Sequence, residues 1–214
     1  MTARAAPVLL AILTGVTGIV DAVSFLSLGH VFVANMTGNV AFIAFAAAGA
    51  PGLSIGGSLI ALAAFMLGAF AGGRLDAATN DVHRLLRTGV ALKVALTAAA
   101  FGVSLAYGQE GTARIALLVL LALAMGLQSA IVRRAAGGEP STNVLTTTLT
   151  ALAVDAPIGG GNGPLAHRVL ATVTMFAGAA AGAALVLHAG PPAAIALAVV
   201  LLAASALAVH AMCC

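Results

Sequence analysis

Residues 7–28 read PVLLAILTGVTGIVDAVSFLSL, an apolar run with a single acid, Asp21, inside it. A transmembrane helix needs about 20 mostly apolar residues, so this run predicts a membrane span. At about 1.5 Å per residue, Asp21 lies about 21 Å into a hydrocarbon core about 30 Å thick. An acid at that depth is costly and usually faces a cavity or a polar partner. The run therefore predicts a helical membrane protein with polar groups inside its bundle.

The composition of the whole chain agrees with this prediction. Of the 214 residues, 62% are hydrophobic and 7% are charged, whereas soluble domains carry about 25% charged residues. This excludes a water-soluble enzyme. The formal charge of +3 is too small for a nucleic-acid-binding face. Cys213 and Cys214 are adjacent and have no other cysteine to pair with, so no disulfide framework is expected. The lipid bilayer is the expected partner.

Hydropathy along the chain predicts eight apolar segments. They are Pro7–Leu28, Val31–Ala48, Leu53–Gly73, Gly89–Tyr107, Thr112–Val132, Thr142–Val154, Val169–His188 and Pro192–Met212. The sixth segment is short and rich in threonine. Because lipid cannot satisfy that many polar groups, we expect it to be buried against protein.

The arginines distinguish two topologies, since cytoplasmic loops collect Lys and Arg. If the second and sixth segments enter and leave on one side and the N-terminus is inside, seven arginines fall inside and only Arg114 outside. If all eight segments span, five fall inside and three outside. We therefore predict an all-α membrane protein of six transmembrane helices plus two interrupted or re-entrant segments, with both termini cytoplasmic. Eight transmembrane helices remain the alternative, because Val31–Ala48 looks long enough to cross.

The two halves of the chain also resemble each other. The matching stretches keep their order at offsets of 108, 109 and 110 residues, and they are Gly18–Ala22 with Gly126–Ala130, Thr37–Asn39 with Thr146–Thr148, and Gly68/Gly72 with Gly178/Gly182. Glycines spaced by four let helices approach closely, so these four are expected to serve helix packing. We predict one polytopic domain, 1–214, built from pseudo-repeats 7–107 and 112–212. With three spans each, the repeats would be inverted, a common plan of transporters.

Three stretches carry a resemblance to a known family. They are Gly15–Leu26, Val31–Asn39 and Ala124–Arg134. Together they resemble the YoaK-like family of bacterial integral membrane proteins, from which this chain departs with Ser129 in place of Asn and Thr147 in place of Gly. The resemblance implies a multi-pass protein of the bacterial cytoplasmic membrane. It implies no activity, because the family's function is unassigned.

Polar residues inside the predicted segments are the candidates for a substrate or ion path. They are Asp21, Asn35, Thr37, Gly38, Asn39, Gln128, Ser129, Thr146 and Thr148. A backbone break at Gly38 would free polar groups to line a cavity. Two inert roles stay open: Asp21 as a cap on the interrupted second segment, and threonine hydroxyls bonded to their own helix. Lys93 lies near the start of its predicted segment, so we expect its ammonium group to reach the interface.

Motifs for enzyme chemistry are weak in this chain. Gly52–Gly56 matches G-x-S-x-G, but no strand precedes it, as that motif requires. The histidines lack metal-ligand spacing, and no cofactor fingerprint occurs, so we expect no metal or cofactor. The sequence favours a non-enzymatic channel or secondary transporter for an unidentified small solute or ion. The alternatives are an intramembrane enzyme acting through Ser54 or Asp21, and a non-catalytic assembly or scaffold protein. Self-association into a homo-oligomer is left open.

Overall fold

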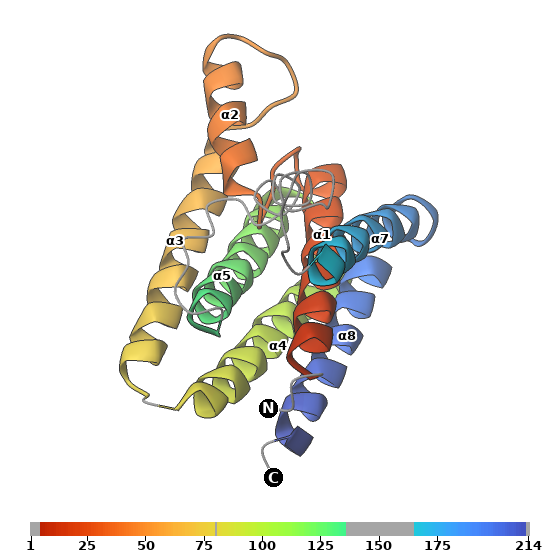
Figure 1. Ribbon diagram of the computed structural model, residues 1–214. Helices are drawn as coiled ribbons and strands as arrows, with labels where there is room; N and C mark the ends of the chain where they lie inside the picture. The colour runs from red at the N-terminus through yellow and green to blue at the C-terminus, as the bar shows by residue number, and fades with distance from the viewer. Residues whose placement is uncertain (1–4, 80, 136–164, 213–214) are drawn as a thin grey trace.

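The computed structural model describes residues 5–79, 81–135 and 165–212, and these residues form helices joined by short loops (Figure 1). Six of the helices are long and apolar enough to cross a membrane. They are α1 (Ala5–Ser27), α3 (Ile55–Ala77), α4 (Val82–Tyr107), α5 (Gly111–Ala135), α7 (Leu165–Ala189) and α8 (Pro191–Met212). The predicted all-α class with six spans is confirmed.

Side-chain caps set the starts of two spans. The Ser54 hydroxyl accepts a hydrogen bond of 3.0 Å from the backbone N–H of Gly57 and begins α3. The Asp81 carboxylate accepts one of 2.9 Å from His83 N–H and begins α4. The predicted start of this span at Gly89 is therefore wrong by two helical turns. Polar side chains in the first turns of α4 lowered its hydropathy, although a capping Asp predicts a helix start.

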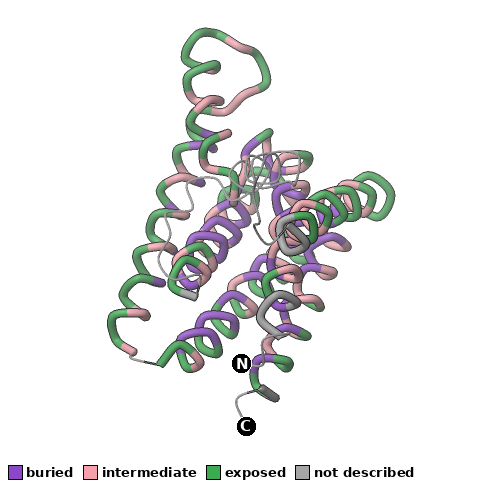
Figure 2. The backbone as a smooth tube through the Cα atoms, in the orientation of Figure 1, coloured by how far each residue is buried: buried purple, intermediate pink, exposed green. Residues whose placement is uncertain are grey.

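The second predicted segment is helical only in its later part, α2 (Met36–Ala47). Its 12 residues make a helix about 18 Å long, well short of a core about 30 Å thick. At the top of the view, α2 rises beyond the start of α3 (Figure 1), and its residues are exposed or half-buried (Figure 2), with only Asn39 buried. Its length excludes α2 from the helices able to span. The other predicted interrupted segment, 142–154, lies outside the described residues.

The spans run in alternating directions. In Figure 1, α1 begins and α8 ends at the same end of the bundle, where α3 is also joined to α4. An ion pair of 3.1 Å between Arg134 and Asp76 brings the C-terminal ends of α5 and α3 together there. At the opposite end, the guanidinium of Arg114 near the start of α5 approaches Gly29 just past α1. It follows that α1 and α5 run in opposite directions.

Two close glycine contacts join helices from different halves of the chain. At the contact of α1 with α7, a Cβ on Gly18 would lie 2.6 Å from the backbone nitrogen of Ala179. At the contact of α3 with α5, a Cβ on Gly126 would lie 2.8 Å from that of Ala69. Real Cβ atoms do not approach backbone this closely, so both contacts require glycine. In each pair, residues later in one helix contact residues later in the other, so the two paired helices are parallel.

The glycines expected to serve packing lie at these same two contacts. A Cβ on Gly68 would meet the backbone of Leu123, and a Cβ on Gly178 would meet the backbone of Gly15. Gly72 and Gly182 lie one turn further on; Cβ atoms there would come within 2.7 Å of Ala130 Cβ and 2.8 Å of Ile19 Cα. The buried core lies around α1 and α5, the most enclosed of the spans (Figure 2).

Candidate functional site

Asp21 holds the loop that follows α1. Its Oδ1 atom accepts hydrogen bonds from the backbone N–H groups of Val33, at 3.0 Å, and Ala34, at 2.8 Å. The side chain is 6% exposed. Backbone N–H groups that leave helical geometry need other acceptors when buried. Asp21 therefore acts as a cap on the extended residues that precede α2.

Asn39 holds the same loop from the other side. Its amide oxygen accepts from the N–H of Phe32 at 2.9 Å, and its amide nitrogen donates to the carbonyl of Phe32 at 2.6 Å. Gly38 lies directly beneath the Phe32 ring, where a Cβ would be 2.8 Å from a ring carbon. We call Asp21, Asn39 and the loop residues Phe32, Val33 and Ala34 the loop clamp. It explains why helix α2 begins at Met36 and not at the start of the apolar run.

Aromatic rings cover the loop clamp. Phe32 stacks on Phe25 of α1 with ring centroids 5.0 Å apart, and on Phe42 of α2 at 5.6 Å. His30 meets Phe25 edge to face at 5.2 Å. Such pairs contribute about 0.5–1.5 kcal/mol beyond their burial. The end of α1 and the start of α2 are thus joined by polar and aromatic contacts together.

A second polar group crosses the bundle. The Lys93 ammonium of α4 donates to the amide oxygen of Gln128 on α5. The amide nitrogen of Gln128 donates to the hydroxyl of Thr17 on α1 at 3.0 Å. Thr17 in turn donates to the carbonyl of Leu13 in its own helix at 2.9 Å. We call Lys93, Gln128 and Thr17 the polar chain; it links three spans.

The position of Lys93 corrects the expectation that it reaches the interface. Lys93 is 1% exposed, and because α4 begins at Val82, it lies about 16 Å along its helix. A lysine at the centre of a span costs about 2.5–3.5 kcal/mol on insertion scales. It is the functional candidate that sequence reasoning missed. The signal that could have found it was the Asp81 cap, which moves the helix start back.

The loop clamp and the polar chain approach each other on α1. Thr17 and Asp21 are four residues apart in this helix, so they lie on one face, one turn from each other. No ion pair joins Asp21 to Lys93, both of which are described. Two of the predicted path residues, Asp21 and Asn39, thus meet at one loop. A third, Gln128, lies in the neighbouring polar chain.

The remaining candidates belong to neither the loop clamp nor the polar chain. Ser129 is exposed and its hydroxyl donates to the carbonyl of Met125 in its own helix at 2.9 Å. Asn35 and Thr37 are exposed beside the loop clamp. Thr146 and Thr148 lie outside the described residues. The structure therefore does not bring the full predicted set together.

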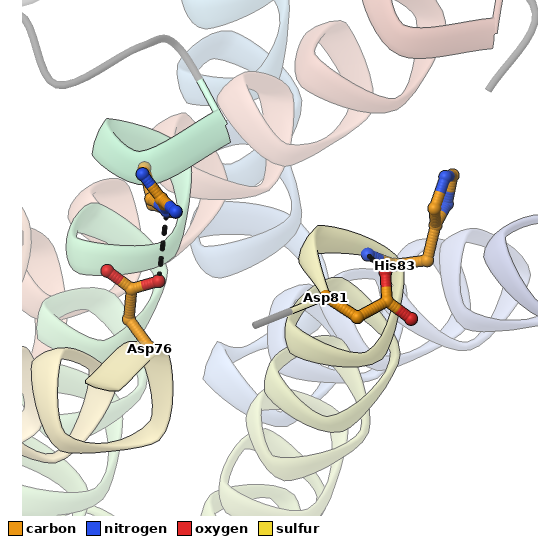
Figure 3. A network of polar contacts seen from close by, with 4 residues as sticks. Asp76, Asp81 and His83 are labelled. Carbon is orange, nitrogen blue, oxygen red and sulfur yellow. Dashed lines mark hydrogen bonds and ion pairs between the residues drawn. The ribbon is translucent and has the colours of Figure 1, made fainter. Parts of the chain in front are cut away.

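Charged side chains mark the two ends of the bundle. Figure 3 shows Asp76, whose dashed line is the ion pair to Arg134, near the Asp81 cap of α4. The side chain of Arg134 is 54% exposed and that of Asp76 is 35% exposed. A salt bridge this exposed contributes at most about 1 kcal/mol. Arg114 lies at the opposite end, beside Gly29. Arg134 and Arg114, which the six-span topology assigns to opposite sides of the membrane, thus lie at opposite ends of the bundle.

Two other features bear on chemistry. The hydroxyl of Ser54, the serine of the G-x-S-x-G match, accepts the hydrogen bond that starts α3. A hydroxyl engaged as a helix cap gives no support to the idea that Ser54 acts as a nucleophile. Within the described ranges, no three side chains of His, Cys, Asp or Glu gather as metal ligands would.

Comparison with known families matches residues 9–208 to the family described as "Protein of unknown function (DUF1275)". The UPF0700 transmembrane protein YoaK of Bacillus subtilis (strain 168) is 32% identical over 149 residues, which cover 69% of this chain and 65% of that protein. The chain thus spans less than two thirds of this relative's length. No solved structure matches the chain. The matches confirm the resemblance found in the sequence motifs, and the relative's name agrees with a multi-pass membrane protein.

Proposed function

Because the chain belongs to the DUF1275 family, whose function is unknown, we propose a function from its geometry: passage of a small solute or ion across the membrane, as a channel or secondary transporter. The observation that carries the proposal is the polar chain. It places Lys93, Gln128 and Thr17 of three different spans in contact at mid-depth. Ionisable residues inside membrane bundles commonly mark ion and substrate pathways.

The helix pairs support an inverted internal repeat. Under the predicted correspondence, α1 matches α5 and α3 matches α7. The parallel pair α1 and α7 then has its counterpart in the parallel pair α3 and α5, with glycine at the matching positions Gly18 and Gly126. Because α1 and α5 run in opposite directions, the symmetry axis lies in the membrane plane. Transporters of this plan bind their solutes near the midplane between the repeats.

We place the path between the polar chain and the loop clamp. Both lie along one face of α1, and the clamp leads toward the end of the bundle where α1 meets α2. The backbone of residues 32–34 in the loop clamp is not helical. Within a membrane, such backbone is tolerated only where protein or a water-filled cavity surrounds it. Asp21 and Gln128 are the two predicted path residues that this arrangement retains at the centre.

We also propose the orientation. The end that holds Asp76 and Asp81 also holds five arginines, Arg74, Arg84, Arg87, Arg133 and Arg134, and it faces the cytoplasm of a bacterial cell, as the positive-inside rule requires. Both chain termini then lie on the cytoplasmic side, and the loop clamp lies toward the outer side.

The test is solute passage in liposomes that contain the purified protein. Light scattering after an osmotic step reports how fast glycerol, urea, sodium chloride or sodium formate enters. We expect at least one of them to enter faster than in empty vesicles, and Gln128→Leu to remove the difference. The matched control is Ser205→Ala, because Ser205 is a buried polar residue of another span whose hydroxyl donates to the carbonyl of Leu201 in its own helix. Entry rates equal to those of empty vesicles for all four solutes would count against passage.

An assembly or scaffold protein remains the second candidate. It is favoured by the exposed apolar surface of α2, which carries Val40 and Phe45. An intramembrane hydrolase has less support, since its proposed Ser54 is engaged as a helix cap.

A further inference from the structure

We infer that Lys93 forms the cationic end of a binding site for a small monovalent anion inside the bundle, an inference that rests on the proposed path. An ammonium group carries three N–H donors. Within the described residues, the Lys93 ammonium has one acceptor, the amide oxygen of Gln128. Two donors are thus left for a ligand, in a side chain that is 1% exposed.

The acids of the described chain are engaged away from Lys93. Asp21 accepts the backbone N–H groups of the loop clamp, Asp76 pairs with Arg134, and Asp81 caps α4. Glu110 is exposed at the junction of α4 and α5, at the end of the bundle. None of them lies within ion-pair distance of Lys93. A buried charge needs a counter-charge, because apolar surroundings do not replace the water that it loses. A bound anion supplies that counter-charge.

The polar chain holds the ammonium group without neutralising it. Every hydrogen bond in the chain runs away from Lys93: Lys93 donates to Gln128, Gln128 to Thr17, and Thr17 to a carbonyl. The hydroxyl of Thr97, one turn along α4, donates to the backbone carbonyl of Lys93 at 2.9 Å. These neighbours fix the position of the amine and add no negative charge.

The chemistry of the site defines the ligand class. One cation balances one negative charge, so a second charge on the ligand would stay unpaired in the membrane. The ligand must also accept two N–H donors within a packed bundle. Chloride, nitrate and formate meet both conditions, whereas a large organic anion such as gluconate does not fit a packed interior.

Anion binding is tested with the full-length protein in detergent. Its melting temperature is measured in sodium chloride, nitrate or formate, with sodium gluconate keeping the ionic strength constant. We expect a saturable rise of several degrees for at least one small anion, because a ligand that binds only the folded state stabilises it. Lys93→Met and Lys93→Gln should abolish the rise, and Ser205→Ala should keep it. No saturable rise, or a rise that persists in Lys93→Met, overturns the inference.

A second measurement does not depend on how the variants fold. Equilibrium dialysis of the unaltered protein with radioactive chloride should show saturable binding that approaches one ion per chain and is displaced by formate. Absence of binding at any concentration where the protein is folded overturns the inference.

The two proposals fail separately. Anion binding without faster solute entry into liposomes leaves the Lys93 site standing and removes the path. Faster entry of glycerol or urea without any anion binding leaves the path standing and removes the anion site.

Discussion

The Oδ1 atom of Asp21 lies 2.8 Å from the backbone nitrogen of Ala34, thirteen residues further along the chain. The bond reaches from within a span to the loop beyond its end. It shows why an acid is present in an otherwise apolar helix: the loop carries N–H groups that have no helical partner, and one of them, at Val33, is fully buried. The same carboxylate takes the N–H of Val33, so one oxygen satisfies two backbone donors.

Replacing Asp21 separates its capping role from a charge-carrying role. Asp21→Asn should keep the fold, because an amide oxygen still accepts, and should lower the free energy of unfolding by about 1 kcal/mol since neutral acceptors bind less strongly. Asp21→Leu should cost about 2–6 kcal/mol, because the buried N–H of Val33 and the half-buried N–H of Ala34 both lose their acceptor. Thermal melting in detergent gives the comparison.

The same two variants test whether Asp21 takes part in passage. If it only caps the loop, Asp21→Asn liposomes should show the solute entry rates of the unaltered protein from pH 5 to 8. Entry that loses its pH dependence while the melting temperature is kept would instead assign the carboxylate a proton or a cation.

The glycine contacts make a prediction with a control one turn away. Gly68→Ala should destabilise the protein by about 1–3 kcal/mol, since a Cβ there meets the backbone of Leu123 and forces the helices apart. Gly73→Ala in the same helix should be neutral or stabilising by up to about 1 kcal/mol, because nothing lies within 4 Å of its Cβ and alanine favours helix. Equal effects in the two variants would remove the contact of α3 with α5 as the cause.

The polar chain predicts coupling between Lys93 and Gln128. Gln128→Leu should lower the free energy of unfolding by about 1–3 kcal/mol, because it leaves a buried ammonium group without its acceptor. In the Lys93→Met background the same change should cost less, since no ammonium is then left unpaired. Melting curves of the two single variants and the double variant measure the coupling, expected at about 0.5–3 kcal/mol. Additive effects would place the two side chains apart.

The proposed orientation is tested with single cysteines in a protein that lacks Cys213 and Cys214. Ala78→Cys, at the exposed junction of α3 and α4, should resist an impermeant thiol reagent added outside intact cells. Glu110→Cys, at the exposed junction of α4 and α5, should react readily. Opening the cells should make both reactive. The reverse pattern in intact cells would invert the orientation.

Hydropathy predicted the six spans because each is long enough to be recognised by composition alone. It could not show where the helix begins within the second segment, because the bonds from Asp21 and Asn39 that keep residues 32–34 out of a helix join residues far apart in the chain. It also placed Lys93 near an interface, because the charged first turns of α4 look like a loop. The capping residue Asp81 would have shown that α4 begins before these charged turns.

The candidate site was predictable only in part. Asp21, Asn39 and Gln128 are polar residues in apolar runs, and the sequence alone identifies them as candidates for the path. Their division into a loop clamp and a polar chain depends on which helices are neighbours in space. That arrangement brings Thr17 of the first span into contact with Gln128, 111 positions later in the chain.

The contact between Gly18 and α7 has a consequence for biosynthesis. Chains usually fold from the N-terminus as they are made, yet α1 receives this partner only after most of the protein has been translated and inserted. Until then the glycine face of α1 is in contact with lipid or with the insertion machinery. A chain that ends before α7 leaves that face uncovered, which exposes the truncated product to membrane quality control. The packing of α1 therefore depends on a helix from the second half of the chain.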